Sequence, residues 1–133
     1  MGMDYAARAR ALVGTRFRPQ GRDERGLDCV GLAIETYEIP AESVRRDYQL
    51  RGNHRAEIER GLKRYFRRVS KRDARCGDVM LLQVASEQLH LAVRTDVGFV
   101  HAHAGLRRVV ETPGEPEWPL MGVYRKRTKK RSS

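Results

Sequence analysis

Residues 26–32, GLDCVGL, place a cysteine directly after an acidic residue, between two glycines and ahead of an apolar run. The apolar residues that follow recur at helical spacing up to Pro40, which predicts a mostly buried helix from Cys29 to about Tyr37. Cys29 would then lie in the first turn, where unpaired backbone N–H groups and the positive end of the helix dipole stabilise a thiolate. The alternative interpretation is that Cys29 is a small buried hydrophobic residue.

Two further helices are predicted on either side of this stretch. The first covers residues 5–13, with Asp4 as its N-cap and Gly14 at its end. Residues 15–28, which are rich in glycine, arginine and other polar residues, are predicted to form a loop. The second helix covers residues 56–69, where one face is apolar and the opposite face is basic. We interpret the basic face as solvated.

The period of the apolar residues changes from helical to alternating after residue 78. Five β-rich runs follow, separated by turn-forming residues, and they cover residues 79–84, 89–95, 99–103, 106–111 and 120–126. Helices followed by strands indicate an α+β fold, with N-terminal helices packed on an antiparallel β-sheet. We predict a single domain over residues 1–124 and a basic, disordered tail over residues 125–133, because the tail has nothing apolar to bury.

The formal charge of +10 is distributed unevenly along the 133 residues. Residues 60–75 carry a net charge of +7 and residues 125–131 one of +6, which leaves −3 for the remainder. The basic surplus therefore lies away from the cysteine stretch. A nucleic-acid-binding module would account for this surplus, but no stacking or groove-reading motif accompanies it, so we do not expect nucleic acid as the partner.

The cysteines and the apolar segments indicate in which cellular compartment the protein is made. Cys29 and Cys76 are far apart in the sequence, which is not the pattern of a secreted disulfide framework, although one bridge is compatible with it. The first residues, MGMDYAARARALVG, contain no apolar signal core, and no later stretch has the length of a membrane span. We expect a protein made in the cytoplasm, without a signal peptide and without a membrane span.

A nucleophilic cysteine needs a base, and the chain contains four histidines. His54 lies in a polar stretch between charged residues, and we interpret it as a surface histidine. His90 opens the predicted strand HLAVRT, whereas His101 and His103 lie in FVHAHAG, where alternation puts both on one face. An antiparallel partner strand could bring His90 beside either of them. Such a pair would supply a base and a second histidine that orients it.

The order of these motifs resembles the NlpC-type cell-wall cysteine peptidases, a papain-like family of peptidoglycan hydrolases. Three segments carry the resemblance over most of the chain: GTRFRPQGRDERGLDCVGL, CGDVMLL and LHLAVRTDVGFVHA. The family's D-C-x-G-L pattern matches residues 28–32, its G-D strand matches residues 77–80, and its H-x-x-[IV] strand matches residues 90–93. Its third polar residue, in a v-H-A strand, matches His101, and His103 is the competitor for this role.

The resemblance implies a two-step acyl transfer at Cys29. The cysteine attacks a carbonyl of a peptidoglycan stem peptide, and His90 accepts the thiol proton and later protonates the leaving amine. His101 holds the imidazole of His90 in the useful tautomer. The resemblance implies no metal and no other cofactor; three histidines could suggest zinc, but their strand context and the matched cysteine argue against a metal site.

The predicted substrate-binding or oxyanion region consists of Phe17, Gln20, Asp28 and His103. In much of the family, a tyrosine stands twelve residues before the nucleophile, and its hydroxyl contributes near the oxyanion site. Phe17 occupies this position here, so the donor is missing. Loss of one oxyanion donor costs on the order of a hundredfold in rate.

The short chain and its GTxF…QGR approach to the cysteine further resemble the small NlpC-type proteins of phage tails and gene transfer agents. This narrower resemblance implies a protein carried on a virion or tail-like particle and acting on the cell wall. Its partners would be peptidoglycan stem peptides and phage-tail or baseplate proteins. The alternative is a structural tail component of the same fold that is catalytically weak or inactive, which Phe17 favours.

Overall fold

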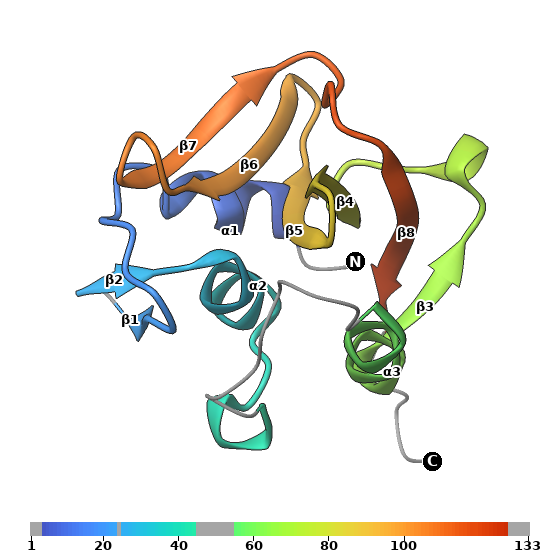
Figure 1. Ribbon diagram of the computed structural model, residues 1–133, viewed down its shortest axis with the longest axis horizontal. Coiled ribbons are helices and arrows are strands. Elements are labelled where there is room, and N and C mark those ends of the chain that lie inside the picture. The colour runs from blue at the N-terminus through green and yellow to red at the C-terminus, as the bar shows by residue number, and fades with distance from the viewer. Residues whose placement is uncertain (1–3, 24, 45–54, 128–133) are drawn as a thin grey trace.

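The protein is described here by a computed structural model covering residues 4–23, 25–44 and 55–127 (Figure 1). Its helices are α1 (Tyr5–Ala11), α2 (Cys29–Tyr37) and α3 (Arg55–Tyr65), with short 3-10 turns η1 (Ala41–Ser43) and η2 (Lys71–Asp73). Its strands are β1 (Arg22–Asp23), β2 (Gly26–Leu27), β3 (Phe66–Val69), β4 (Val79–Ala85), β5 (Gln88–Arg94), β6 (Gly98–His103), β7 (Arg108–Pro113) and β8 (Leu120–Lys126). The predicted α+β class, with an antiparallel sheet, is confirmed.

Six strands form one sheet in the order β3-β8-β4-β5-β6-β7, and every pair of neighbours is antiparallel. The strands from β4 to β7 follow one another as hairpins, whereas β8 returns to pair with β4 and also with β3. The two-residue strands β1 and β2 form a separate small hairpin beside α2. This arrangement brings the start of α2 next to β5 and β6 (Figure 1).

Two apolar clusters lie on opposite faces of the sheet, because side chains alternate along each strand. Leu81, Leu91 and Val93 belong to the larger cluster, which contains the buried residues of α2. Met80 and Leu82 belong to the smaller cluster, which Trp118 borders. Since both faces are covered, the first four residues of β4 are all fully buried, and this explains their unbroken apolar run.

The two N-terminal helices begin where the sequence predicts. The side chain of Asp4 accepts a hydrogen bond from the backbone N–H of Ala7, which confirms the expected cap of α1. This helix ends at Ala11, two residues before the predicted end, and the chain turns through Gly14, whose φ of +97° suits glycine. The bounds of α2 are those predicted, and most of its residues are buried.

The helix predicted over residues 56–69 is only partly correct. Helix α3 ends at Tyr65, and residues 66–69 form β3, which pairs with β8. Pairing with a strand more than fifty residues later places Phe66 in the core, and this long-range contact overrides the local helical spacing.

Three other boundaries differ from the prediction. Residues 15–28 contain the β1–β2 hairpin, and β7 begins at Arg108 because residues 104–107 form the turn that precedes it. Arg125 and Lys126, which the sequence patterns place both in the β-rich run 120–126 and in the tail, belong to β8, whose bounds are those of the predicted run. Arg125 is held there by the buried carboxylate of Asp78. Residues 128–133 of the predicted tail and His54 lie outside the described residues.

None of the helices in the described part of the chain has the length and apolar character needed to cross a membrane.

Candidate active site

Helix α2 begins at the candidate nucleophile, and Asp28 holds this start in place. One carboxylate oxygen of Asp28 accepts a hydrogen bond of 2.8 Å from the backbone N–H of Gly31, and the other accepts one of 2.8 Å from Gln20. Asp28 therefore caps the helix and ties the preceding loop to it. A Cβ at Gly31 would lie 1.9 Å from the carbonyl oxygen of Gly21, so the close approach of loop and helix requires glycine there.

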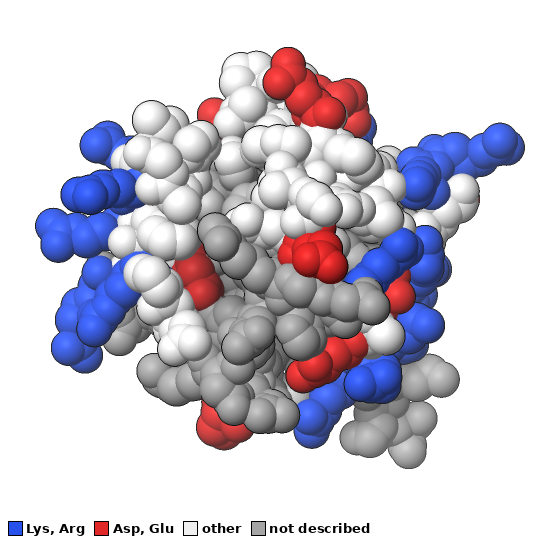
Figure 2. All heavy atoms as spheres, in the orientation of Figure 1, with Lys and Arg blue, Asp and Glu red and all other residues white. Residues whose placement is uncertain are grey.

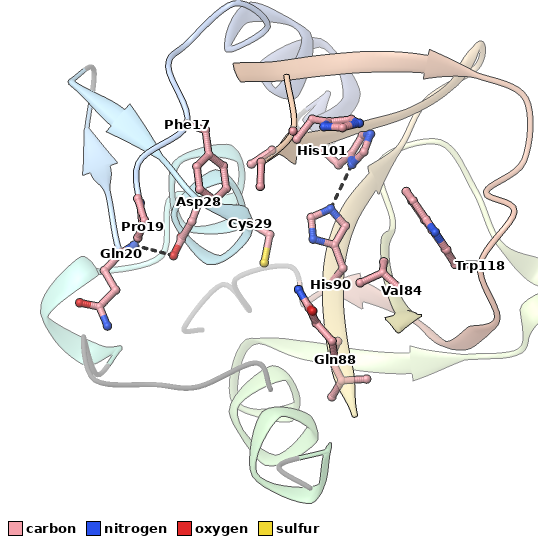
Figure 3. A pocket seen from close by; sticks show the side chains of 15 residues that line it. Phe17, Pro19, Gln20, Asp28, Cys29, Val84, Gln88, His90, His101 and Trp118 are labelled. Atoms are coloured by element: carbon pink, nitrogen blue, oxygen red, sulfur yellow. Dashed lines mark hydrogen bonds between the residues drawn. The ribbon is translucent and has the colours of Figure 1, made fainter. Parts of the chain in front are cut away.

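A pocket of about 410 Å³ opens at this point, between the start of α2 and the strands β5 and β6. Every residue that the sequence places in the site lines it: Phe17, Gln20, Asp28, Cys29, His90, His101 and His103. In Figure 3, the Cys29 side chain extends from the start of α2 into the pocket, on the side where the ring of His90 lies. Cys29 is 3% exposed, so the pocket reaches a thiol that bulk solvent barely touches.

The two central histidines come from neighbouring strands. His90 lies on β5 and His101 on β6, and the two strands are paired at Val93–Val100 and Arg94–Phe99. Beyond the paired part, Nε2 of His90 lies 3.0 Å from Nδ1 of His101 (Figure 3). This bond leaves Nδ1 of His90 available for Cys29. The predicted combination of one nucleophile and two histidines is therefore present in one place.

The hydrogen bonds of His101 define a consistent set of tautomers. Nε2 of His101 lies 3.3 Å from the hydroxyl oxygen of Thr112 on β7. If Nδ1 of His90 is to accept a proton from Cys29, Nε2 of His90 must carry a hydrogen and donate it to His101. His101 then carries its own hydrogen on Nε2 and donates it to Thr112. The line of contacts thus runs from His90 through His101 to a threonine hydroxyl, and Cys29 lines the same pocket.

His103 does not share in this line of contacts. Its Nδ1 accepts a hydrogen bond of 3.1 Å from the backbone N–H of Leu106, within the turn between β6 and β7. Its ring also lies against Gly105, where a Cβ would be 3.0 Å from it. Of the two alternatives for the residue beside His90, the geometry places His101 there and assigns His103 to the turn and the pocket wall.

The protonation of Cys29 differs from the expectation. Burial raises the pKa of the Cys29 thiol to about 12, the charge of Asp28 acts in the same direction, and hydrogen bonds from the backbone of Leu91, Cys29 and Val30 lower it by less. The helix start contributes in the predicted direction, but the dry surroundings outweigh it. The resting cysteine is a neutral thiol.

Burial has the corresponding effect on the two histidines. Burial, together with the nearby His101 and His103, lowers the pKa of His90 to about 3. Burial lowers the pKa of His101 to about 4, and His103 adds to this shift. Both imidazoles are therefore neutral at neutral pH, so His90 is in the form that accepts a proton.

The sequence predicted one further residue of the pocket wall, Phe17, as a departure from the family, and it missed two residues of the site: Trp118, which lines the pocket, and Thr112, which contacts His101 but does not line the pocket. Phe17 lines the pocket as a half-buried ring and brings no hydroxyl. The Gln20 side chain extends away from the Cys29 sulfur in Figure 3. Trp118 and Thr112 were not predicted, because they lie on or next to β7, far in sequence from any motif.

Trp118 forms an aromatic wall beside the histidines. Its ring centroid lies 6.2 Å from that of His90 and 5.8 Å from that of His101, in edge-on geometry. It also contacts Phe99 at 6.4 Å and borders the smaller apolar cluster. Trp118 is the single tryptophan in the chain, and this alone could have indicated from the sequence that the segment contributes to a pocket or to the core.

A metal site would need several ligating side chains close together. No group of three or more histidine, cysteine or acidic side chains with the arrangement of a metal site occurs among the described residues.

Comparison with solved structures identifies the fold. The NlpC/p60 domain of the peptidoglycan hydrolase SagA superposes with a TM-score of 0.59 at 19% sequence identity, covering 83% of this chain and 86% of that one. The peptidoglycan hydrolase RipB from Mycobacterium tuberculosis gives a TM-score of 0.57 at 16% identity, and the match covers 92% of this chain but 62% of RipB. The protein therefore has the papain-like NlpC/p60 fold. No family model and no curated protein matches its sequence.

Proposed function

We propose that this protein hydrolyses amide bonds in the stem peptides of peptidoglycan, with Cys29 as the nucleophile. The observation that carries the proposal is that Cys29 lines one pocket with His90 and His101, whose ring nitrogens lie 3.0 Å apart. The motif resemblance and the fold shared with two peptidoglycan hydrolases support the choice of substrate. A neutral thiol beside a neutral imidazole is a competent starting state, because the base can take the proton as the new bond forms.

In the first step, the Cys29 sulfur bonds to the carbonyl carbon while the thiol proton moves to Nδ1 of His90. His101 accepts the hydrogen bond from Nε2 of His90 and so stabilises the imidazolium that forms. The carbonyl oxygen becomes an oxyanion, for which the backbone N–H groups at the start of α2 are fixed donors, whereas the Phe17 side chain offers none. The C–N bond then breaks, and His90 returns its proton to the leaving amine.

In the second step, water attacks the thioester that remains on Cys29. His90 takes a proton from this water, the C–S bond breaks, and the cysteine recovers its proton. The products are a carboxylic acid and a free thiol, so the cycle needs no oxidant, reductant or metal.

A place on a phage tail or a gene-transfer-agent particle is part of this proposal. It is supported by the sequence resemblance to the small members of the family, and it would bring the enzyme to the cell wall from outside. Tail or baseplate proteins would then be its structural partners.

A second candidate function is a structural tail component of the same fold with little or no catalysis. Two observations favour it: Phe17 lacks the hydroxyl found in much of the family, and burial raises the pKa of the Cys29 thiol to about 12. Both would slow the chemical step without disturbing the fold.

The test is to incubate the purified chain with peptidoglycan sacculi and to identify the released fragments by mass spectrometry. We expect new amino termini within stem peptides. Cys29→Ala should reduce release by about a thousandfold or more, because only this thiol can form the acyl-enzyme. Cys76→Ser is the matched control, since Cys76 is exposed and lies outside the pocket, and it should release fragments at the wild-type rate.

Release by Cys29→Ala but not by Cys76→Ser would refute the assignment of the nucleophile. A folded wild-type chain that releases nothing from any sacculi would favour the structural component instead.

A further inference from the structure

Exposed cations form a strip along one edge of the molecule, remote from the pocket. We call it the β3 basic face, and it consists of Arg60, Lys63, Arg64, Arg67, Lys71, Arg72 and Arg127. It follows the edge strand β3, from α3 at one end to η2 at the other. Figure 2 shows basic side chains gathered on the rim where these elements lie, and a second, separate group on the opposite rim.

The β3 basic face has few acidic neighbours. Glu57, Glu59 and Asp73 are the acidic residues of α3 and η2. The carboxylate of Glu59 is engaged by Arg55 at 3.1 Å and by the Tyr124 hydroxyl at 3.2 Å. Among the cations of α3, β3 and η2, the ion pairs found within residues 4–23, 25–44 and 55–127 include Arg55 and the exposed Arg68, both paired with Glu59, and none of the residues of the β3 basic face.

Repulsion between some of these positive charges destabilises the folded state. Arg60 and Arg64 are one helical turn apart on α3, and like charges at this spacing repel each other. Arg67 lies directly opposite Arg125 in the β3–β8 register, and like charges in this position are also unfavourable. The Arg125 charge is compensated by Asp78, which leaves Arg67 to face solvent.

Structural reasons account for only part of the strip. Charges on an edge strand prevent pairing with other chains, which explains Arg67. Cations in the last turn of a helix complement its dipole, which explains Lys63 and Arg64. Neither reason applies to Arg60, in the middle of α3, or to Arg72, beyond the end of β3.

The composition of the β3 basic face differs from that of a protein interface and from that of a base-stacking nucleic-acid module. A protein interface has an apolar centre and few lysines. The β3 basic face lacks such a centre, because no large exposed apolar residue among the described ones lies on α3, β3 or η2; those residues are Val13, Val97 and Leu106. A module for nucleic acid stacks bases on exposed aromatic rings. The aromatic ring beside this face, Tyr65, is half-buried and has Arg64 over it at 5.6 Å.

We propose that the β3 basic face binds a linear phosphate polymer through charge alone. Attraction of this kind needs a row of accessible cations and no shaped pocket, which is what the strip provides. The strands order as β3-β8-β4-β5-β6, so a polymer on β3 leaves the pocket at β5 and β6 open. The face would thus hold the protein on an anionic surface, and this role does not depend on the proposed catalysis.

The experiment measures binding of the full chain to fluorescently labelled polyphosphate between about 50 and 200 mM salt. The test variant combines Arg60→Gln, Arg64→Gln, Arg67→Gln and Arg72→Gln. The matched control combines Arg16→Gln, Arg18→Gln, Arg107→Gln and Arg108→Gln, which removes the same charge from exposed positions elsewhere. Circular dichroism verifies that both variants are folded.

We expect the test variant to lose tenfold or more in affinity at the lowest salt. The slope of log affinity against log salt should become shallower by about 3, since each lost phosphate contact removes about 0.7 to 0.9 from it. The control should lose less than threefold and keep the wild-type slope. Equal losses in the two variants, or no binding by the wild type, would overturn the proposal.

A second arm tests whether the face recognises anything besides the charge of the polymer. A poly(glycerol phosphate) chain and an oligothymidylate, each with the same number of charges as the polyphosphate, should compete equally well, because only charge is read. Preference for the oligothymidylate by more than tenfold would overturn the proposal in favour of a nucleic-acid site.

Discussion

At the scale of single residues, the structure separates the position of Cys29 from its protonation. The helix start lies where the sequence predicts, and its N–H groups act on the thiol in the expected direction. Burial is a property of the assembled pocket, and local sequence does not show how dry the pocket is. Burial raises the thiol pKa for this reason, so in the proposed mechanism the activation of Cys29 would depend on His90 rather than on the helix dipole.

The resting thiol can be tested directly. In a Cys76→Ser background, the wild-type Cys29 should show no thiolate absorbance in the ultraviolet at pH 7, and alkylation by iodoacetamide should be slow and should accelerate with rising pH. The reason is that burial raises the pKa of Cys29 to about 12. Cys29→Ala in the same background provides the baseline. A thiolate signal already saturated at pH 7 would show that the helix start outweighs burial.

Thr112 is expected to act as a positioning residue for His101. Thr112→Val keeps the shape of the side chain but removes the acceptor for Nε2 of His101. We expect a loss of about 1 kcal/mol, or about fivefold in kcat, with KM unchanged, and restoration of kcat by Thr112→Ser. The ring nitrogen chemical shifts of His101 should show a mixed tautomer in the valine variant only. A valine variant with the wild-type tautomer would contradict this role.

At the scale of elements, the sequence predicts what depends on local periodicity and misses what depends on distant partners. Helix α2 and strands β4, β5 and β6 carry strong apolar patterns and lie within one or two residues of their predicted bounds. Strand β3 has no such signal, because Phe66 becomes a strand residue only through its pairing with Lys126 on β8.

The candidate site shows the same division. Cys29, His90 and His101 could be predicted because each belongs to a short motif, and their spatial proximity followed from the antiparallel hairpin. Thr112 and Trp118 could not be predicted, since they reach the site from β7 and from the connection between β7 and β8. The tail prediction failed at Arg125 for a related reason, because its buried partner Asp78 lies at the start of another strand.

The Asp78–Arg125 pair should fasten the beginning of β4 to the end of β8. Two hydrogen bonds of 2.9 Å join the groups, and Asp78 also accepts one of 2.8 Å from the backbone N–H of Arg75. Arg125→Ala would leave a buried carboxylate unpaired, with an expected loss of about 2 to 3 kcal/mol in the free energy of unfolding.

Urea denaturation measures this loss, and Lys126→Ala is the matched control, because the Lys126 side chain makes only a 3.4 Å contact with a carbonyl oxygen. The control should stay within about 0.5 kcal/mol of the wild type. Truncation after Tyr124 should destabilise the fold as Arg125→Ala does. Equal stability of Arg125→Ala and the wild type would show that the pair contributes nothing.

At the scale of the whole molecule, the candidate active site and the β3 basic face lie on different parts of the sheet. The pocket is built where α2 meets β5 and β6, whereas the β3 basic face lies beyond β8 on the other side of β4. The positive charge of this face therefore lies away from Cys29 and the two neutral histidines. Under the proposed mechanism, this separation would let the protein bind an anionic surface without making the imidazolium at His90 more costly to form.

The buried histidine pair also makes the stability of the whole molecule depend on pH. Folding lowers the pKa of His90 to about 3 and that of His101 to about 4, from an ordinary value near 6.5. Below about pH 6.5 the unfolded chain therefore binds protons at these sites that the folded chain does not, and the free energy of unfolding falls as the pH falls. The slope is at most about 1.4 kcal/mol per pH unit for each histidine.

The window between about pH 6.5 and 5.5 isolates this effect, because Glu59, Glu111 and Glu115, whose pKa values are lowered by their arginine partners in the folded chain, cost stability only where the unfolded chain takes up their protons, near the ordinary pKa of 4.5. Urea denaturation across this window should show the wild type losing stability steadily. His90→Gln combined with His101→Gln should flatten the dependence, whereas His103→Gln should keep it, since that variant leaves the pair intact. A double variant with the wild-type slope would show that the pair is not held neutral by burial. That result would also remove the reason for treating His90 as a base that is ready to accept the thiol proton at neutral pH.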